Sequence, residues 1–274
     1  MGGVEYDWAA MLTDYGRRDG FVAACHGVIA RLAPSVRVID ITHDVPPQNI
    51  RHGAAVLAQT VPYLPAAVIV AVVDPGVGTP RRRVAIRAGD SVLVGPDNGI
   101  LGWAADGLGG VHEAVSLTAV EYHLPGRAST FDGRDVFAPV AAHICLGTPL
   151  AELGPPANEL VVLPAPLVRV EGGVLHAEIL SVDHFGNVQL AARPVDLAAA
   201  GMTTGVGWVG VGDSARRIAN VRIATTFTDV DVGEPLLYVD AAGYAAIAVN
   251  RGRAAELLGV RTGDVIRIAP SDMA

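Results

Sequence analysis

The sequence contains no lysine, and all 20 of its basic residues are arginine. This absence excludes a Schiff-base lysine and a Walker-type phosphate loop, since both chemistries need the lysine amine. Charge is also scarce: only 18% of the residues are charged, and the net charge is −8 at pH 7. A nucleic-acid binder gains its affinity by neutralising phosphates, so this acidic balance argues against nucleic acid as a partner.

Cysteine is nearly absent as well. Cys25 and Cys145 both fall in apolar segments with helical spacing. This placement favours two buried free thiols over a disulfide and suits a reducing compartment. No apolar run reaches the ~18 residues that a membrane-spanning helix needs, and no basic region followed by an apolar core opens the sequence. We therefore expect a cytoplasmic protein with no membrane partner.

What the chain has in abundance is apolar material: 51% of its 274 residues are hydrophobic. That is ample for the core of one large domain or two ordinary ones. In the first half, apolar β-like runs alternate with helical stretches, which predicts an α/β domain with a mainly parallel sheet flanked by helices. The expected strands are 8–13, 36–41, 67–73, 83–88 and 91–95, and the expected helices are 20–32, 50–61 and 134–145, the last bent at Pro139.

The composition changes near Gly154. The segment from Gly154 to Pro166 carries four prolines and has no helical period, so we predict two domains, 1–160 and 161–274. Beyond this boundary the pattern is one of short alternating β runs separated by glycine, which predicts a smaller antiparallel β-barrel or sandwich. The expected strands are 174–182, 187–192, 206–211, 218–224, 235–239, 244–249 and 264–268.

One stretch, AVIVAVVDPGVGTPRRRVAI at 67–86, organises the first half. Its apolar run is typical of a parallel strand buried on both faces, and Asp74 follows at the carboxyl end, where open α/β sheets bind ligands. A Pro-Gly-Val-Gly turn then separates Asp74 from Arg81. The alternative is a capped strand followed by a solvated basic loop, and we expect Arg82 and Arg83 to be surface charge.

Other carboxylates follow β-like runs. Asp14, Asp44 and Asp97 each follow such a run, and Asp132 and Asp135 lie where the helix expected at 134–145 begins. Several of these groups could meet at one edge of the sheet, where an acidic crevice suits a cation, a metal ion or ligand hydroxyls. The alternative is turn formation, because aspartate readily bonds its own following backbone.

A metal site is a second alternative at this edge. His43 and Asp44 with Asp14 and Asp74 would supply nitrogen and oxygen ligands. No ligand motif at a diagnostic spacing supports this set, so we expect no metal. The PGVG turn is not followed by a helix, which makes it a weak dinucleotide signal. Nucleophilic acyl transfer is disfavoured too, since the chain has no G-x-S-x-G elbow and no cysteine–histidine signature.

In the second half, Ser181–Val188 (SVDHFGNV) is the densest polar cluster on a β background. Asp183, Phe185 and Asn187 could hold an amine and a flat base. The alternative for the same residues is a hairpin turn.

Taken together, these blocks closely resemble the S-adenosyl-L-methionine (SAM) hydrolases that form adenosine, also called SAM hydroxide adenosyltransferases, which are related to the fluorinase and chlorinase. The resemblance covers nearly the whole chain, and its motifs are long and ordered. The matching stretches are TDYG at 13–16, VIDITHDVPP at 38–47, VDPGVGTPRR at 73–82, VGPDNGIL at 94–101, TFDGRDVFAPVAA at 130–142, DHFGNV at 183–188 and GYAAIAVNRGRAAELLG at 243–259.

The resemblance implies an N-terminal α/β domain, a C-terminal antiparallel β domain, and a homotrimer with active sites between neighbouring subunits. It also implies a reaction in which water displaces L-methionine from C5′ of the ribose of SAM, giving adenosine. SAM is then a substrate, and no cofactor is implied.

The family's catalytic trio is Asp, Arg and His. Its first two members correspond to Asp74 and Arg81, and its third falls at Asp132, where the family usually reads FHGRD and this chain reads FDGRD. Where relatives often carry Asn-Ser before the Gly-Tyr, this chain has Asp240-Ala241-Ala242. The substrate-binding positions implied by the resemblance are Asp14 for the ribose hydroxyls, Asp183 for the methionine amine, Phe185 and Asn187 for the adenine region, and also Asn98, Gly133, Tyr244 and Arg251.

A sulfonium leaving group departs neutral and needs no general acid, so the site must supply an aligned water, a dry pocket and a proton acceptor. The hypothesis is that Asp74 orients or deprotonates this water and that Arg81 holds Asp74. Asp132 would either face Asp74, which would raise one carboxyl pKa, or pair with Arg81. In both cases we predict slower hydrolysis than in a relative with histidine.

Three other functions stay open. The main one is a catalytically weak protein that binds SAM or adenosine. A halogenase is disfavoured, because Asp74 would occupy the place where a halide must lose its water and where halogenases carry tyrosine. A metal-dependent hydrolase is the third.

Overall fold

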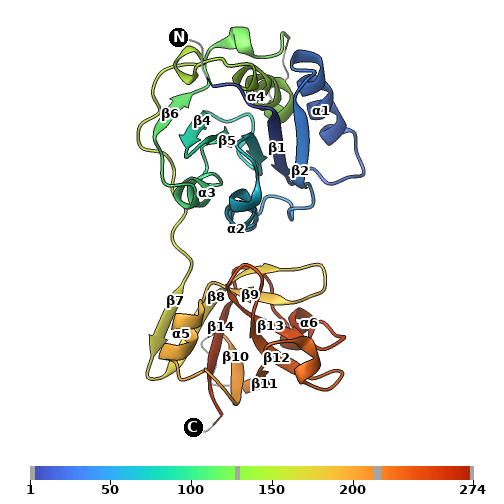
Figure 1. Cartoon of the computed structure of the whole chain (residues 1–274), viewed down its shortest axis with the longest axis vertical. Helices are drawn as coiled ribbons and strands as arrows, with labels where there is room; N and C mark the ends of the chain where they lie inside the picture. The colour runs from blue at the N-terminus through green and yellow to red at the C-terminus, as the bar shows by residue number, and fades with distance from the viewer. Residues whose placement is uncertain (1–3, 127–129, 213–216, 272–274) are drawn as a thin grey trace. The chain divides into compact units, whose positions relative to one another are not determined.

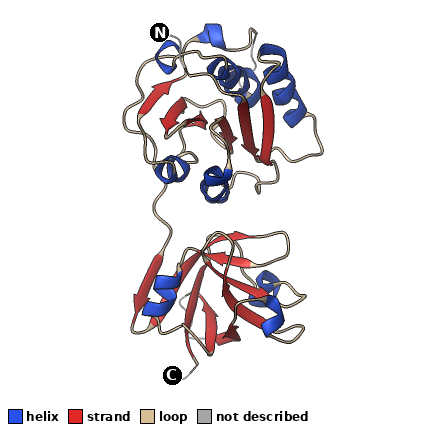
Figure 2. Cartoon of the chain, in the orientation of Figure 1, coloured by secondary structure: helices blue, strands red, loops and turns tan. Residues whose placement is uncertain are grey.

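The structure, a computed structural model, describes residues 4–126, 130–212 and 217–271. The chain forms two compact units, Met1–Leu163 and Pro164–Ala274, whose helices and strands are shown in Figures 1 and 2. The division falls after Leu163, whereas the sequence pattern places it after residue 160. None of the described helices combines the length and the apolar character that crossing a membrane requires.

A six-stranded sheet forms the centre of the N-terminal unit. Its strand order is β2-β1-β3-β5-β4-β6, with β2, β1, β3 and β5 parallel and β4 antiparallel to both of its neighbours. The predicted mainly parallel sheet is therefore confirmed. The strands are β1 (Trp8–Thr13), β2 (Arg37–Thr42), β3 (Val68–Val72), β4 (Arg83–Ala88), β5 (Ser91–Pro96) and β6 (Glu113–Ser116).

Helices cover both faces of this sheet, as Figure 1 shows. Successive side chains of a strand point to opposite faces. Val68 and Val70 of β3 accordingly pack with α1 and α4, while Ile69 and Ala71 pack with α2 and α3. This explains why the sequence of β3 is an unbroken apolar run. The helices are α1 (Phe21–Leu32), α2 (Ile50–Thr60), α3 (Gly102–Gly107) and α4 (Ala138–Cys145), with short 3-10 helices η1 (Val61–Tyr63), η2 (Val120–Tyr122) and η4 (Leu150–Glu152).

The last helix of this unit begins with an irregular turn, and the expected bend at Pro139 stays a prediction. A π-helical segment, η3 (Gly133–Phe137), precedes α4, and Pro139 lies in the first turn of α4. Proline is tolerated there because the first N–H groups of a helix have no intrahelical partner. The irregular turn follows directly after Asp132, the third predicted catalytic residue, and π-helical turns occur frequently at functional sites.

Both cysteines belong to this unit and are buried and free, as predicted. Burial raises the pKa of the Cys25 thiol and of the Cys145 thiol to about 12 in each case. Because the thiolate is the reactive form, these residues act as inert apolar side chains.

The C-terminal unit is a closed seven-stranded barrel. The strands follow the order β14-β10-β11-β12-β13-β9-β8, β14 pairs with β8 to close the barrel, and β7 adds to β8 outside it. The predicted barrel is confirmed, but β11 and β12 pair in parallel. The elements are β7 (Val168–Glu171), β8 (Val174–Val182), β9 (Val188–Leu190), α5 (Pro194–Ala199), β10 (Val206–Val211), β11 (Arg217–Ile223), η5 (Phe227–Asp229), β12 (Pro235–Val239), β13 (Ala245–Val249), α6 (Ala254–Leu258) and β14 (Val265–Pro270).

Candidate active site

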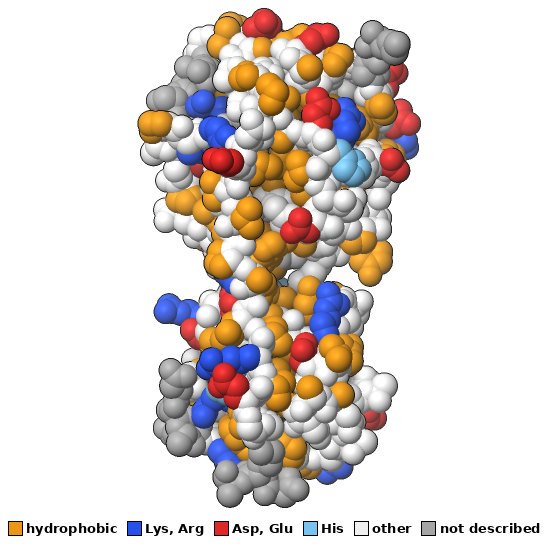
Figure 3. All heavy atoms as spheres, turned by 90° about the vertical axis from the view of Figure 1, so that its left-hand side faces the viewer, with side chains coloured by type: hydrophobic (Ala, Val, Ile, Leu, Met, Phe, Trp, Pro, Cys, Tyr) orange, Lys and Arg blue, Asp and Glu red, His pale blue; other side chains and the backbone are white. Residues whose placement is uncertain are grey.

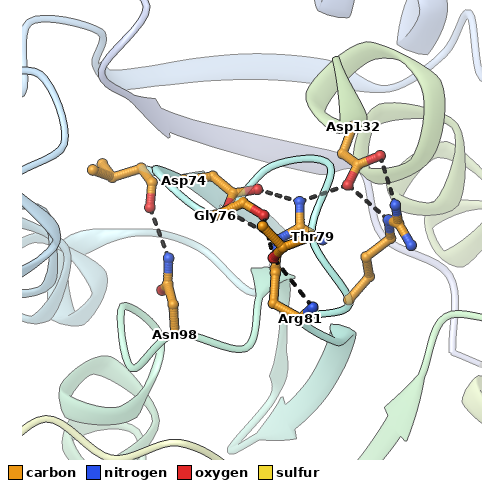
Figure 4. A network of polar contacts seen from close by, with 8 residues as sticks. Asp74, Gly76, Thr79, Arg81, Asn98 and Asp132 are labelled. Atoms are coloured by element: carbon orange, nitrogen blue, oxygen red, sulfur yellow. Dashed lines mark hydrogen bonds and ion pairs between the residues drawn. The ribbon is translucent and has the colours of Figure 1, made fainter. Parts of the chain in front are cut away.

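Three predicted site residues lie where adjacent parallel strands end. Asp14 follows β1, Asp74 lies just beyond β3, and Asn98 lies just beyond β5. The backbone N–H of Asp14 donates to Val72 O (3.3 Å), and the Asn98 side chain donates through Nδ2 to Val73 O (2.8 Å), which joins the three strand ends. Figure 4 shows Asn98 and Asp74 on this edge. The edge is the place where open α/β sheets bind their ligands.

A tight turn brings Arg81 back onto Asp74. The Thr79 hydroxyl and its backbone N–H both donate to Gly76 O (2.7 and 3.1 Å), and Gly78 has φ of +83°, a conformation that favours glycine. The turn therefore closes tightly and reverses the chain direction. The alternative interpretation, a capped strand followed by a solvated basic loop, would require neither property.

The trio predicted from the family resemblance is assembled around Arg81, as Figure 4 shows. Arg81 Nε donates to Asp74 Oδ1 (2.9 Å) and Nη2 donates to Asp74 Oδ2. The same Nη2 donates to Asp132 Oδ2 (2.5 Å). All three side chains are buried, with exposed fractions of 6% for Asp74, 10% for Arg81 and 1% for Asp132. One guanidinium thus bridges two buried carboxylates.

Arg81 keeps one unused donor. Its Nη1 is buried and has no hydrogen-bond partner among the described residues. Burial lowers the pKa of Arg81, but the hydrogen bonds and charges of Asp74 and Asp132 outweigh this effect, and its pKa is raised. The group is therefore a permanent cation with free N–H bonds, which can orient an oxygen atom of a ligand or of water.

The structure corrects our interpretation of Arg83 as surface charge. Arg83 donates from Nε to Asp132 Oδ2 (2.7 Å) and from Nη2 to Asp132 Oδ1 (3.1 Å). Burial raises the pKa of Asp132, but the hydrogen bonds and charges of Arg83 and Arg81 lower it further, so the net pKa lies below the usual value. Of the two roles considered for Asp132, the structure has the one in which it pairs with Arg81.

Arg82 is not free surface charge either. Its Nε donates to Asp97 Oδ2 (2.8 Å), and its Nη1 and Nη2 donate to the carbonyl oxygens of Asn158 and Glu159 (2.7 Å each). Asp97 Oδ1 also accepts the backbone N–H of Val161 (2.8 Å). Asp97 therefore links the end of β5 to the backbone at Val161, and it is not part of the group of carboxylates around Arg81.

The remaining carboxylates have partners of their own. Asp14 Oδ2 accepts the backbone N–H of Gln48 (2.9 Å), and Asp135 accepts Arg134 Nε (2.6 Å). Asp44 pairs with Arg17 on the surface (3.1 Å). Of the predicted carboxylates, Asp74 and Asp132 thus share one arginine, and Asp14 lies at the end of the neighbouring strand.

The metal set considered from the sequence does not assemble. Within residues 4–126, 130–212 and 217–271, the one group of histidine and acidic ligands close enough to share an ion is His26, Asp40 and His43. Neither Asp14, Asp44 nor Asp74 belongs to it, because each is engaged elsewhere.

Tyr15 is a residue of this region that the sequence analysis missed. A Cβ built on Gly133 would lie 2.0 Å from the Tyr15 hydroxyl oxygen, so glycine at 133 leaves room for the phenol. Burial raises the pKa of Tyr15 well above its usual value, and the charges of Cys25, Asp14, Asp74 and Asp132 add to this. The sequence contained the signal: Tyr15 is part of the TDYG block, from which only Asp14 was taken.

The C-terminal unit carries a separate pocket of about 800 Å³. Four predicted binding residues line it, namely Asp183, Phe185, Asn187 and Arg251, and Phe227, Tyr238 and Asp240 are lining residues that the sequence analysis missed. Tyr244 does not line it: its ring lies against Arg193, 3.7 Å from the guanidinium carbon.

Asp183 stabilises a hairpin turn and also lines the pocket. Its Oδ1 accepts the backbone N–H groups of Phe185 (2.9 Å) and Asn187 (2.8 Å), and its Oδ2 accepts Asn187 Nδ2 (2.8 Å). The hairpin-turn interpretation is therefore correct, and the same turn presents Phe185, which is 71% exposed, at the pocket.

A second carboxylate, Asp240, lies beside Ala241 and Ala242 in the pocket lining. Asp240 accepts the backbone N–H groups of Ala242 and Tyr244 at Oδ1 (2.9 Å each) and Gln189 Nε2 at Oδ2 (2.6 Å). Burial together with the charges of Asp183 and Asp240 raises the pKa of Tyr238 to about 12. The pocket thus combines two carboxylates with aromatic walls, which suits a cationic amine and a flat ring.

Comparison with known proteins identifies a family. A family model described as the SAM hydroxide adenosyltransferase N-terminal domain matches residues 9–154, and one described as the C-terminal domain matches residues 177–267. The chain is 56% identical over 263 residues to an (R)-S-adenosyl-L-methionine hydrolase from Salinispora tropica, covering 95% of this chain and 97% of that one. It is 27% identical over 292 residues to a fluorinase from Actinopolyspora mzabensis, covering 96% and 97%.

A solved structure agrees with these matches. The crystal structure of an uncharacterized conserved protein from Thermotoga maritima superposes with a TM-score of 0.88 at 37% identity, covering 95% of this chain and 99% of that chain.

Proposed function

The chain belongs to the SAM hydroxide adenosyltransferase family, and from this premise we propose that it hydrolyses SAM to adenosine and L-methionine. The hydrolase that is 56% identical supports water as the nucleophile, whereas the fluorinase is matched at only 27% identity. The observation that carries the proposal is the buried Asp74–Arg81 pair at the carboxyl edge of the parallel sheet.

The chemistry of this site suits attack by water on a sulfonium compound. Methionine leaves C5′ as a neutral thioether, so no general acid is required, and the site must align a water, take its proton and exclude bulk solvent. The carboxylate of Asp74 would accept the proton of the water, and Arg81 fixes the orientation of Asp74 by two N–H···O hydrogen bonds. Both side chains are buried, which keeps bulk solvent out. We propose that the unused Arg81 Nη1 orients the attacking water or a ligand oxygen.

The binding roles stay proposals from the family resemblance. Asp14 would bind the ribose hydroxyls, Asp183 the methionine amine, and Phe185 and Asn187 the adenine region. Asp240 lines the same pocket as Asp183 and would add a second carboxylate for the methionine amine. We further propose Asn98, Gly133, Tyr244 and Arg251 as substrate-binding residues, and a reaction that uses no cofactor and no metal.

The test is chromatography of SAM incubated with the protein, with and without a chelator. We expect adenosine and L-methionine in equal amounts, at the same rate in both arms. Because the relative from Salinispora tropica is named for the (R) sulfonium, both configurations should be supplied, and we expect faster release from (R). A 5′-halo-adenosine product in chloride or fluoride would contradict water as the nucleophile.

A second candidate function is a catalytically weak protein that binds SAM or adenosine. The observation that favours it is Asp132, which two arginines hold as a carboxylate where the family has histidine. Tight adenosine binding without turnover over hours would support this alternative.

Replacing Asp132 by histidine is expected to speed adenosine release about 10-fold. This gain in rate is smaller than the ~10²–10⁴-fold that a positioned acid–base group can contribute. It is smaller because the substitution also removes the carboxylate that binds Arg83, which leaves the site less well ordered. In the wild type the pKa of Asp132 lies below its usual value, so Asp132 stays charged throughout the neutral range. The imidazole of the variant, with an ordinary pKa of about 6.5, should add a rise in kcat as the pH increases through that value. Steady-state assays from pH 5 to 9 measure both effects.

Asp132→Asn is the matched control for this substitution. It removes the charge without adding an imidazole, so it should show neither the gain nor the new pH step. If Asp132→His releases adenosine no faster than the wild type, the proposed disadvantage of aspartate at this position is wrong.

We also propose a cytoplasmic homotrimer with active sites between subunits. The N-terminal unit supports an assembly, because hydrophobic side chains gather on the face seen in Figure 3, and Val161 and Val162 are 48% and 72% exposed. Exposed apolar patches commonly mark interaction surfaces. Size-exclusion chromatography with light scattering should give three times the chain mass of 28.3 kDa, and a monomer at micromolar concentration would contradict it.

A further inference from the structure

Three side chains outside the proposed mechanism converge on one point of the N-terminal unit. His26 of α1, Asp40 of β2 and His43 just after β2 each offer a ligand atom, and these atoms lie within 4.8 Å of one another. His26 Nε2 is 2.8 Å and His43 Nε2 is 2.9 Å from the same oxygen, Asp40 Oδ1. The two imidazole rings lie 6.2 Å apart between centroids. We refer to these residues as the His26–Asp40–His43 cluster.

His43 is the anomalous member of this cluster. Its side chain is only 3% exposed, and Nδ1 is hydrogen-bonded to Thr13 Oγ1 (2.8 Å). Nε2 is buried and lies 2.9 Å from Asp40 Oδ1 as an ion-pair contact, but it has no well-aligned hydrogen-bond partner among the described residues. Buried polar atoms in proteins nearly always have a partner. A cation between the nitrogen and the oxygen would satisfy both.

We propose that the His26–Asp40–His43 cluster binds one divalent transition-metal ion, such as Zn²⁺. Two imidazole nitrogens and one carboxylate oxygen favour Zn²⁺ or a neighbouring first-row ion over Mg²⁺ and Ca²⁺, which prefer oxygen ligands. Zinc bonds of about 2.0–2.2 Å separate neighbouring ligand atoms by about 3–4 Å, a range compatible with three ligand atoms that lie within 4.8 Å of one another.

The surroundings of the cluster meet the other requirements of a metal site. Asp40 and His26 are 41% and 34% exposed, which gives the ion an entry path and leaves a position for water. The contact between His43 Nδ1 and Thr13 Oγ1 fixes the ring, as the outer partners of metal ligands usually do.

Binding at this cluster would stabilise the turn that carries Asp14. His43 contacts Thr13 through its ring, and its carbonyl oxygen accepts the backbone N–H of Gly16 (2.8 Å). The ion lies outside the groups proposed to react, so its effect is on stability and not on the chemical step.

Zinc titration of the chelator-treated, dialysed full-length protein tests the proposal. Calorimetry should give one ion per chain, and the melting temperature should rise by about 5 °C at free zinc about 100 times Kd. His26→Ala removes a half-exposed ligand from the surface of α1 and should weaken binding at least ~10-fold. His112→Ala, which removes an exposed histidine of the same unit, is the matched control and should bind zinc like the wild type.

Asp40→Asn and Co²⁺ binding give independent readouts. Asp40→Asn should also weaken zinc binding, and Co²⁺ in the wild type should show visible absorption bands that His26→Ala loses. Absence of stoichiometric binding overturns the proposal, as does equal affinity in the wild type, His26→Ala and Asp40→Asn.

Discussion

Asp74→Asn is expected to lower kcat for SAM hydrolysis by about 10²- to 10⁴-fold, the range that a positioned general base contributes. The amide keeps the shape of the side chain but cannot take the proton of the attacking water. It also turns an N–H group toward Arg81, which already donates to both oxygens of Asp74. The water is then neither deprotonated nor oriented. Steady-state measurement of kcat and KM separates this loss from a loss of substrate binding, since we expect KM to change by less than kcat.

Asp44→Asn is the control for this change. Asp44 also follows a strand of the sheet, but it is exposed and pairs with Arg17 on the surface. Removing a surface pair is worth about 1 kcal/mol or less, so the control should keep wild-type kcat. If Asp74→Asn retained kcat within about 3-fold of the wild type, Asp74 could not be the proton acceptor of this reaction.

The N-terminal fold was predictable because its sequence pattern is regular. The run before Asp74 is apolar at every position, since both faces of β3 are covered by helices. The strands and helices through β5 follow from such runs and from helical spacing. The elements missed in this unit, α3 and β6, have six and four residues, too few for a period to be recognised.

The seven barrel strands of the C-terminal unit were predictable, but β7, α5, α6 and the way the strands pair were not. Barrel closure depends on the contact between β14 and β8, whose residues are far apart in sequence. The parallel pairing of β11 with β12 likewise leaves no local sequence signal. The pocket depends on this arrangement, and therefore Tyr238 and Asp240 were not found although Asp183 was.

The arginine triplet shows what alternation could have predicted at the active site. Consecutive side chains of an extended segment point to opposite sides. Arg81 and Arg83 accordingly both bind Asp132, while Arg82 points away to Asp97. With Arg81 assigned inward, the two-residue period would have placed Arg83 inward as well, although we expected it to be surface charge. The partner itself, 49 residues further along the chain, could be found only through the fold.

The last prediction concerns the guanidinium that joins the two carboxylates. Arg81→Lys is expected to lower kcat/KM by about 10²- to 10³-fold, as for loss of one preorganised donor in an active site. A lysine keeps the positive charge but replaces a planar fork by a single ammonium group, which cannot bind both oxygens of Asp74 and also reach Asp132. The two buried carboxylates would then face each other with weaker compensation, and Asp74 would lose its fixed orientation.

Arg87→Lys is the matched control for Arg81→Lys, because Arg87 is a partly buried arginine of the same sheet that pairs with Glu113 (3.4 Å) away from the trio. Its kcat/KM should stay within about 3-fold of the wild type, since the pair is partly solvated. Circular dichroism and melting temperature establish that both variants are folded, so that a loss confined to Arg81→Lys reports on the site. Equal activity of the two variants would mean that the charge of Arg81 suffices and that the bidentate geometry is not needed. In that case Arg81 would act only as a counter-ion, and the orientation of Asp74 would depend on the turn at Gly76–Thr79.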